Sequence, residues 1–504
     1  MHSFADPLNH ARRTAARRSA FVCGNESFAY ADLVARCEAL VGALLSLGLE
    51  RGDRVAILAD NCHRYVETYM AVPAGGMVVV PLNTRHAEPE LRYALEDSGA
   101  RVLLTDRDPS TFAAVVDHVV TLPDGYETLL DQASPAELGA GIDENSLAGL
   151  FYTGGTTGAS KGVMLSHRNL IANAFHWLAV VPQEPDDRFL CMAPMFHAAG
   201  SIQFISTVWT GGCQVVLPTF DPAAALDLIE EHEITVSLGV PAMLAAIAEE
   251  QLARPRRTSS LRACGHGGSP IATEVVRRAH AAMPSAELIE VYGATELSPL
   301  ATALRNEQDR TDDERGRSCG QPVPGVEIKI LDAQGKECAP GEVGEVTVRG
   351  PNVMQGYWGK PEQSAAALVD GRYWTGDLGT MDDGGYLFLV DRSKDMIVSG
   401  GENVYSTEVE EILYQHPAVL EAAVFGIPDE KWGEAVHAVI VPREGCEALD
   451  TAELISLCRD KIASYKVPKA IELRSEPLPK SGPGKVLKRE LRAPYWADRD
   501  RQVG

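Results

Sequence analysis

The sequence has no long uninterrupted apolar run, no paired cysteines and no excess of positive charge. Its most apolar segment, residues 70–82, is broken by proline and glycine, whereas a bilayer-spanning helix needs about 18 apolar residues or more. The N-terminus lacks the charged and then apolar pattern of a secretory signal. We therefore expect a cytoplasmic protein without a transmembrane segment, while peripheral contact with a membrane stays open.

The ten cysteines are scattered and form neither a Cys-x-x-Cys pair nor a His/Cys group with zinc spacing. They indicate reduced, mostly buried thiols. The formal net charge is −24, and nucleic-acid binding needs clustered Lys and Arg. The charge argues against nucleic acid as a partner, but not against a small anion at a local basic site. The oligomeric state stays open, with a homodimer as the commonest assembly.

The length of 504 residues and the apolar content of 45% are typical of a soluble protein with several domains. In the first half, helical and strand-like patterns alternate, which is typical of parallel α/β layers. The expected helices are 31–47, 65–72, 88–98 and 222–232, and the expected strands are 54–58, 77–81, 101–105 and 234–238. The last part, of about 110 residues, predicts a small α+β unit. There a capping box at Thr407 and Glu410 opens a helix.

The most informative segment is residues 152–162, which read YTGGTTGASKG. Backbone N–H groups and hydroxyls of such a loop can surround a phosphate chain, with the Lys161 ammonium balancing charge. An apolar strand precedes the loop, and a helix capped by Ser166 follows it. The order strand, loop and helix predicts a site for a nucleoside triphosphate.

The composition of this loop is also compatible with three other interpretations. A Walker A loop needs adjacent Gly and Lys followed by Ser or Thr, but Lys161 lies between Ser160 and Gly162. The Gly-x-Ser-x-Gly match at 158–162 fits a hydrolase elbow poorly, because several loop residues separate the serine from the strand. An ordinary flexible surface loop would be the default if the rest of the chain carried no further motif.

Four further motifs follow in order: YGATE at 292–296, YWTGD at 373–377, DRSKDMIVSGGEN at 391–403 and PKSGPGK at 479–485. Together with the 152–162 loop, they resemble the motifs of the adenylate-forming superfamily. That superfamily includes acyl-CoA synthetases, aryl-CoA ligases, beetle luciferases and peptide-synthetase adenylation domains. The resemblance covers nearly the whole chain, from Phe28 to Lys488, and five motifs in register make chance a poor explanation.

The resemblance implies an α/β fold with a large N-terminal α/β domain of several subdomains at residues 1–391. A small, mobile α+β C-terminal domain would follow at 392–504. The family has a hinge at the position of Asp391. Rotation there would present Lys485 for one half-reaction and Gly400 with Gly401 for the other, so that one site serves two reactions.

The chemistry implied by the resemblance begins with a carboxylate, a poor electrophile that ATP must activate. Attack on the α-phosphate concentrates negative charge that positioned cations and donors stabilise. By resemblance, Lys485 supplies the cation, Thr295 contacts the α-phosphate and Glu296 is the Mg²⁺ ligand. Taken alone, Lys485 would be an exposed lysine and Glu296 a carboxylate at a helix start; their motif positions favour the catalytic roles.

The remaining ATP contacts follow from the same resemblance. The phosphate loop contains Thr153, Gly154, Gly155, Thr156, Thr157, Gly158 and Lys161. The adenine walls contain Gly267, Gly268, Ser269, Tyr292, Gly293 and Ala294. Asp377 would accept from both ribose hydroxyls, and Arg392 would be a second ribose or phosphate contact. Residues 265–270 are not a dinucleotide fingerprint, because Pro270 replaces the third glycine.

The acyl and CoA sites are also implied by resemblance. His197 matches a position that lines the carboxylate pocket and would orient the acyl group or gate its tunnel, although an isolated histidine is more often structural. Gly200 and Gly239 are expected to line the same pocket and to leave room for the acyl group. Ser399, Gly400 and Gly401 would form the channel for the CoA pantetheine, and their ordinary alternative is a turn between strands.

These features predict an AMP-forming acid–thiol ligase that uses ATP, Mg²⁺ and CoA. It would form an acyl-AMP with release of pyrophosphate and then transfer the acyl group to CoA. Gly154, where many family members have serine, favours a fatty acid substrate. An aryl-CoA ligase is the nearest alternative, followed by an adenylation enzyme that loads a carrier protein. A non-catalytic nucleotide-binding protein is the alternative from another class, and it would not need Lys485.

Overall fold

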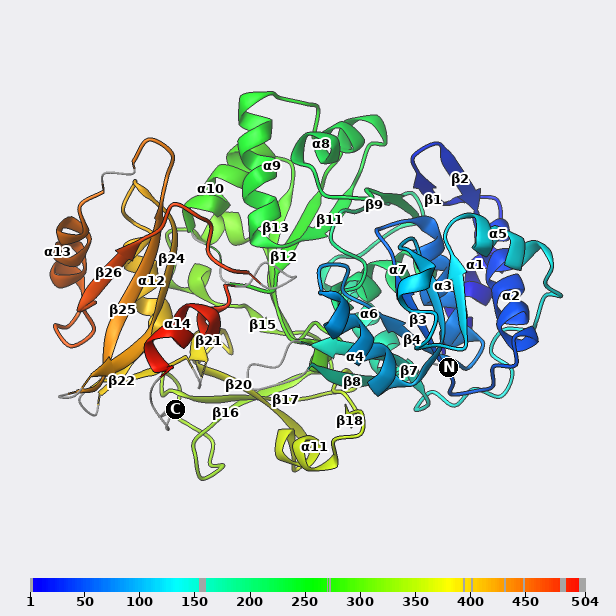
Figure 1. The fold of residues 1–504 in the computed structure, drawn as a ribbon. Coiled ribbons are helices and arrows are strands. Elements are labelled where there is room, and N and C mark those ends of the chain that lie inside the picture. Colours follow the sequence, from blue (N-terminus) through cyan, green and yellow to red (C-terminus); the bar gives the residue numbers. More distant parts are fainter. Residues whose placement is uncertain are drawn as a thin grey trace. The chain divides into compact units, whose positions relative to one another are not determined.

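The computed structural model describes residues 3–153, 160–269, 271, 273–392, 395–399, 402–429, 432–446, 449–480 and 486–497 (Figure 1). Contacts divide the chain into two units. One contains Met1–Ile328 and Val348–Tyr373, and the other contains Lys329–Thr347 and Trp374–Gly504. The predicted boundary after Asp391 stays a prediction. In the part of the chain that the structure describes, no helix is long and apolar enough to cross a membrane.

A nine-stranded sheet of the first unit has the order β15-β14-β13-β12-β11-β9-β10-β1-β2. Its strands are β1 (Ser19–Cys23), β2 (Glu26–Ala29), β9 (Arg188–Cys191), β10 (Cys213–Val216), β11 (Val236–Gly239), β12 (Ala263–Gly267), β13 (Glu287–Tyr292), β14 (Thr302–Leu304) and β15 (Gln321–Pro322). The strands from β1 to β13 in this order pair in parallel. Helices α8 (Pro222–Glu231), α9 (Pro241–Ala253) and α10 (Thr273–Ala282) lie together beside β11 to β13 (Figure 1). These helices form an apolar core with residues of β9, β10, β12 and β13.

A seven-stranded sheet of the same unit has the order β18-β8-β7-β4-β3-β5-β6. Its strands are β3 (Arg54–Leu58), β4 (Val78–Pro81), β5 (Ala100–Thr105), β6 (His118–Thr121), β7 (Leu147–Thr153), β8 (Lys161–Ser166) and β18 (Gly356–Tyr357). The unit's other helices are α1 (Ala5–Thr14), α2 (Tyr30–Ser46), α3 (His63–Ala74), α4 (Glu88–Ser98), α5 (Asp124–Asp131), α6 (His167–Val180), α7 (Ala198–Thr210) and α11 (Pro361–Ala367). Short 3₁₀ turns are η1 (Pro109–Thr111), η2 (Thr295–Leu297), η3 (Glu307–Arg310) and η4 (Glu314–Arg317).

A third sheet has the order β16-β17-β20-β19, with β21 paired to β20, and the division of the chain falls within its strands. They are β16 (Glu327–Leu331), β17 (Gly344–Arg349), β19 (Leu368–Val369), β20 (Arg372–Met381) and β21 (Leu387–Arg392). The fourth sheet, in the second unit, has the order β23-β22-β25-β24 with β26 beside β25. It consists of β22 (Ile397–Ser399), β23 (Glu402–Val404), β24 (Val419–Asp429), β25 (Gly433–Pro442) and β26 (Ala470–Leu473).

Both faces of the fourth sheet are buried, which explains the nearly continuous apolar sequences of β24 and β25. Because side chains alternate along a strand, Val424 and Ala438 pack in the cluster that contains α12 (Ser406–Leu413) and α13 (Thr451–Lys461). Phe425 and Val439 pack on the other side with Leu491 of α14 (Lys488–Trp496).

The predicted α/β class is confirmed, with a large N-terminal and a smaller C-terminal part, and most expected helices and strands agree to within a few residues. Two local expectations are wrong. Ser166 caps α6 as expected, but residues 161–166 form strand β8, so α6 does not directly follow the phosphate loop. The α12 helix begins at Ser406 after Tyr405, so Thr407 is no capping residue; its hydroxyl donates to the Val390 carbonyl instead.

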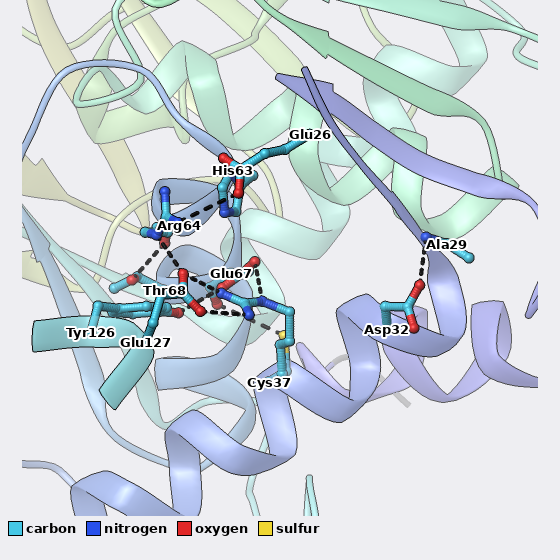
Figure 2. A network of polar contacts seen from close by, with 11 residues as sticks. Glu26, Ala29, Asp32, Cys37, His63, Arg64, Glu67, Thr68, Tyr126 and Glu127 are labelled. Atoms are coloured by element: carbon cyan, nitrogen blue, oxygen red, sulfur yellow. Dashed lines mark hydrogen bonds and ion pairs between the residues drawn. The ribbon is translucent and has the colours of Figure 1, made fainter. Parts of the chain in front are cut away.

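A buried charge network joins α2, α3 and α5 (Figure 2). The side chain of Glu67 is fully buried and accepts from Arg36 Nε at 2.8 Å and from Tyr126 Oη at 2.8 Å. Arg36 also donates to both Glu127 oxygens at 2.8 and 2.9 Å, and Arg64 donates to the same carboxylate. Burial raises the pKa of Glu67, and the Arg36 guanidinium opposes that shift. The three helices are thus held together by a carboxylate that depends on one cation.

Arg36→Met should destabilise this helical layer strongly. It leaves Glu67 buried without its cation, and breaking one partner of a buried pair costs about 3–5 kcal/mol. Arg36→Lys retains the charge but loses the planar fork of donors, so a smaller loss is expected. Urea unfolding of the three proteins measures the difference. Equal stability of Arg36→Met and the unaltered protein would contradict the role given to the network.

Candidate active site

The predicted phosphate loop joins two antiparallel strands. Thr153 at the end of β7 lies opposite Lys161 at the start of β8. Residues 154–159, which include the predicted contacts Gly154, Gly155, Thr156, Thr157 and Gly158, lie outside the described residues. The loop therefore connects two paired strands rather than a strand and a helix. Lys161 is partly buried, and its Nζ lies 4.8 Å from the ring centroid of Tyr357.

The predicted Mg²⁺ ligand Glu296 lies in the turn that follows β13. Its Oε1 accepts a hydrogen bond from Tyr357 Oη at 3.0 Å, and its carbonyl accepts from the Met354 N–H at 2.9 Å. Within the described ranges, no hydrogen bond or ion pair engages the other carboxylate oxygen. No group of three or more His, Cys, Asp or Glu among those residues could hold a metal alone. A single partly free carboxylate fits Mg²⁺, which binds through one or two carboxylates plus phosphates.

Residues 352–358 connect the Glu296 turn to the β7–β8 hairpin. Asn352 Nδ2 donates to the carbonyls of Leu297 and Leu300, both at 2.9 Å, and Ser298 Oγ donates to the Asn352 carbonyl. The Trp358 N–H donates to the Gly162 carbonyl at 2.8 Å. No sequence pattern marks this segment, because its only regular element is the two-residue strand β18.

The predicted adenine wall lies at the carboxyl ends of β12 and β13, an edge at which parallel sheets commonly bind ligands. A methyl group at Gly267 would lie 2.2 Å from the Val291 carbonyl oxygen, so the neighbouring strand itself requires glycine there. Gly268 has a φ of +88° and open space beside it. A methyl group at Gly293 would lie 1.6 Å from the Pro299 carbonyl oxygen. Ser269, Tyr292, Ala294 and Thr295 lie on the same two strand ends and the turn after β13.

A buried polar cluster lies one residue before this wall. His266 of β12 is in register with Glu290 of β13, and His266 Nε2 lies 2.6 Å from Glu307 Oε2. Burial lowers the pKa of His266, but the hydrogen bond and charge of Glu307 outweigh burial, so that pKa is raised. Burial, followed by the charge of Glu307, raises the pKa of Glu290 to about 8, while His266 and the Cys319 thiol act in the opposite sense.

The predicted acyl-pocket residues lie at the start of α7 and at the end of β11. His197 precedes the first residue of α7, and its ring centroid lies 4.4 Å from that of Phe196. A methyl group at Gly200 would lie 3.1 Å from the Met195 carbonyl oxygen. At Gly239 a methyl group would lie 2.9 Å from Met192 Cε. The side chains of Met192 and Met243 are the nearest neighbours of this position, and the role of Gly239 in an acyl pocket stays a prediction.

The predicted ribose contacts belong to the second unit and lie side by side there. Asp377 of β20 is in register with Arg392 of β21, and Arg392 Nε lies 3.3 Å from Asp377 Oδ1. Ser399 is buried and lies opposite Glu402 in the β22–β23 hairpin. Gly400, Gly401 and Lys485 lie outside the described residues, so their roles stay predictions.

The predicted hinge residue Asp391 is held in a buried cluster at the start of α12. Its carboxylate accepts from the N–H of Arg392 at 2.7 Å and from the N–H of Ser406 at 2.5 Å. Lys488 donates to Ser406 Oγ at 2.6 Å and pairs with Glu410 at 2.8 Å. Burial lowers the pKa of Lys488, but the charges of Glu410 and Asp391 outweigh it and raise that pKa.

Comparison with known families identifies both parts of the chain. The family described as "AMP-binding enzyme" matches residues 8–358, and that described as "AMP-binding enzyme C-terminal domain" matches residues 408–485. The chain belongs to the AMP-binding enzyme family. The resemblance to the adenylate-forming superfamily, found from five motifs, is confirmed.

Related proteins and structures match over nearly the full length. A feruloyl-CoA synthase from an Amycolatopsis species is 41% identical over 93% of this chain and 94% of its own. A long-chain-fatty-acid–CoA ligase from Bacillus subtilis is 34% identical over 91% and 89% of the two chains. ATP-bound MatB from Rhodopseudomonas palustris superposes with a TM-score of 0.89 at 32% identity, covering 97% and 99%. MenE from Bacillus subtilis with ATP and magnesium gives 0.86 at 30% identity, covering 96% and 98%.

This AMP-binding enzyme is an AMP-forming CoA ligase that activates an acyl or aryl carboxylic acid. ATP and CoA are its small-molecule co-substrates and Mg²⁺ its cofactor, as predicted. The expectation of a fatty acid is not confirmed, because feruloyl-CoA synthase and indoleacetate–CoA ligase are among the relatives. The homodimer and the cytoplasmic location stay predictions.

Glu290→Gln should flatten the pH dependence of folding stability. The folded-state pKa of Glu290 is about 8, above the value of about 4.3 in an unfolded chain. The protonated form therefore stabilises the fold at low pH, and this contribution is lost as the pH rises towards 8. The expected slope is on the order of 1 kcal/mol per pH unit. Urea unfolding at several pH values between about 5 and 9 compares the two proteins, and parallel profiles would contradict this account.

Lys488→Met should loosen the cluster around Asp391. The carboxylates of Glu410 and Asp391 would remain buried without a cation, at a cost of about 3 kcal/mol. Hydrogen exchange of peptides from β21 and α12 should accelerate. Lys466→Met is the matched control, because Lys466 pairs with the more exposed Glu408 of the same helix, and exposed pairs contribute about 0–1 kcal/mol. Equal exchange in the two variants would contradict a special role for Lys488.

Proposed function

We propose that this chain is a CoA ligase for an aryl-substituted acid with a short linker to the carboxylate. The observation that carries the proposal is the pattern of identity over more than nine-tenths of the chain. Identity is 41% with the feruloyl-CoA synthase and 37% with the indoleacetate–CoA ligase from Aromatoleum aromaticum, against 34% with the Bacillus subtilis fatty acid ligase.

In the first half-reaction, a carboxylate oxygen attacks the α-phosphorus of ATP. Pyrophosphate leaves with the electron pair of the broken P–O bond, and an acyl-adenylate forms. Lys485 and Thr295 are proposed to stabilise the added charge on the α-phosphoryl oxygens. Thr153, Lys161 and residues 154–158 would hold the triphosphate. Glu296 would hold Mg²⁺, which would neutralise phosphate charge.

The nucleoside would be held by residues from several strand ends. Gly267, Gly268, Ser269, Tyr292, Gly293 and Ala294 are proposed to surround the adenine. Asp377 would accept from the ribose hydroxyls, and its neighbour Arg392 would donate to the ribose or a phosphate. The 3.3 Å contact between Asp377 and Arg392 supports a joint role.

In the second half-reaction, the CoA thiol loses its proton and its sulfur attacks the acyl carbonyl carbon. The C–O bond to AMP breaks, and AMP leaves as the thioester forms. Ser399, Gly400 and Gly401 are proposed to line the approach of the pantetheine, after rotation of residues 392–504 about Asp391. His197, Gly200 and Gly239 would contact the acid in both steps.

A panel of acids tests the substrate class. Ferulate, indoleacetate, octanoate and palmitate are each incubated with ATP and Mg²⁺, with and without CoA, and pyrophosphate and thioester are measured. We expect the aryl acids to give the highest kcat/KM, with thioester formed only when CoA is present. Lys485→Ala is the control and should lower pyrophosphate release about 100-fold.

Other outcomes of the panel separate the alternatives. A preference for palmitate would contradict the aryl proposal and support a fatty acid. Acid-dependent pyrophosphate release without a thioester would indicate a carrier protein as acceptor. Bound ATP without pyrophosphate release for any acid would support a non-catalytic nucleotide-binding protein.

A further inference from the structure

Tyr357 contacts two charged groups that the sequence assigns to the triphosphate site. Its hydroxyl donates to Glu296 Oε1 at 3.0 Å, and its ring faces the ammonium of Lys161 at 4.8 Å. Only 7% of Tyr357 is exposed. One buried side chain thus touches both the carboxylate and the cation.

The backbone of Tyr357 is fixed independently of these contacts. It lies opposite Val163 in the pairing of β18 with β8. Its N–H donates to Ser364 Oγ at 2.8 Å, and the next N–H, of Trp358, donates to Gly162. The aromatic ring therefore has a defined place beside Lys161 before any ligand binds.

A neutral side chain between opposite charges also keeps both of them available. Among the residues that the structure describes, Lys161 forms no ion pair, and Glu296 has one unengaged carboxylate oxygen. A direct Lys161–Glu296 ion pair would compete with phosphate and Mg²⁺ for both groups. A ring face attracts a cation without neutralising it, and a hydroxyl donor orients a carboxylate while leaving its charge.

We propose that Tyr357 is a positioning residue that holds the Glu296 carboxylate and the Lys161 ammonium apart and in fixed orientation, so that magnesium and the triphosphate bind together. The proposal rests on the proposed function, because that function makes Glu296 the Mg²⁺ ligand.

Tyr357→Phe separates the contact of the ring from those of the hydroxyl, which also interacts with Tyr373. It keeps the ring face against Lys161 and removes the hydrogen bond to Glu296. The Mg²⁺ concentration for half-maximal ATP binding should rise about ten-fold, in line with the loss of one hydrogen bond to a charged group. Binding of AMP without Mg²⁺ should change less than about two-fold. Tyr357→Leu removes both contacts, so ATP binding should weaken with and without Mg²⁺.

Isothermal titration calorimetry with ATP at increasing Mg²⁺, on the full chain and without any acid, measures this effect. Tyr126→Phe is the matched control. Tyr126 is also buried, donates to Glu67 at 2.8 Å and has the Arg36 guanidinium 5.9 Å from its ring centroid (Figure 2). That variant should lose folding stability and keep the Mg²⁺ dependence of the unaltered protein.

Three results would overturn the proposal. They are an unchanged Mg²⁺ dependence in Tyr357→Phe, an equal loss of ATP and AMP binding, or the same effect in Tyr126→Phe. If Tyr357→Phe folds poorly, Tyr357→His replaces it, because histidine keeps an aromatic face and a hydrogen-bond donor. Only a Mg²⁺ dependence between those of the unaltered protein and Tyr357→Leu would then support the proposal. Binding does not require an acid substrate. Absence of pyrophosphate release with every acid of the panel would therefore refute the proposed function alone. An unchanged Mg²⁺ dependence of ATP binding in Tyr357→Phe would refute this inference alone.

Discussion

The hydrogen bonds between residues 352–358 and two distant parts of the chain determine the geometry of the candidate active site. A triphosphate with its metal needs cations and a carboxylate at fixed separations, yet Lys161 and Glu296 are 135 residues apart in sequence. Asn352 holds the turn that contains Glu296, and Tyr357 contacts both charged side chains. The short strand β18 therefore converts two separate loops into one site.

Buried charged groups outside the candidate active site have partners of opposite charge, whereas Lys161 and Glu296 in the site do not pair with each other. Glu67 with Arg36, Glu307 with His266, and Glu410 with Lys488 are each joined to a partner of opposite sign. A buried charge without such a partner costs several kcal/mol. In the described part of the chain, Lys161 and Glu296 share a neutral neighbour instead. Ion pairs therefore stabilise the fold around the site, while the charges of Lys161 and Glu296 remain available to bind the ligand.

The sequence predicts the elements of this fold where periodicity is local, as for α4 (Glu88–Ser98) and α8 (Pro222–Glu231). It fails where distant contacts decide. Residues 161–166 form a strand because they pair with β7, and Thr407 bonds to Val390. The motifs indicate Glu296 and Lys161 as site residues. No sequence motif indicates Tyr357, His266 or Glu290, because their roles depend on residues that become neighbours only in the folded chain.

In the proposed reaction, the carboxylate attacks the α-phosphate of ATP, and AMP leaves when the thioester forms. An acid labelled with ¹⁸O in its carboxylate tests this directly. If an acyl-adenylate forms, one labelled oxygen passes to phosphorus and remains there when the C–O bond breaks, so mass spectrometry should find ¹⁸O in AMP. Label in inorganic phosphate with ADP as product, or AMP without label, would contradict the account.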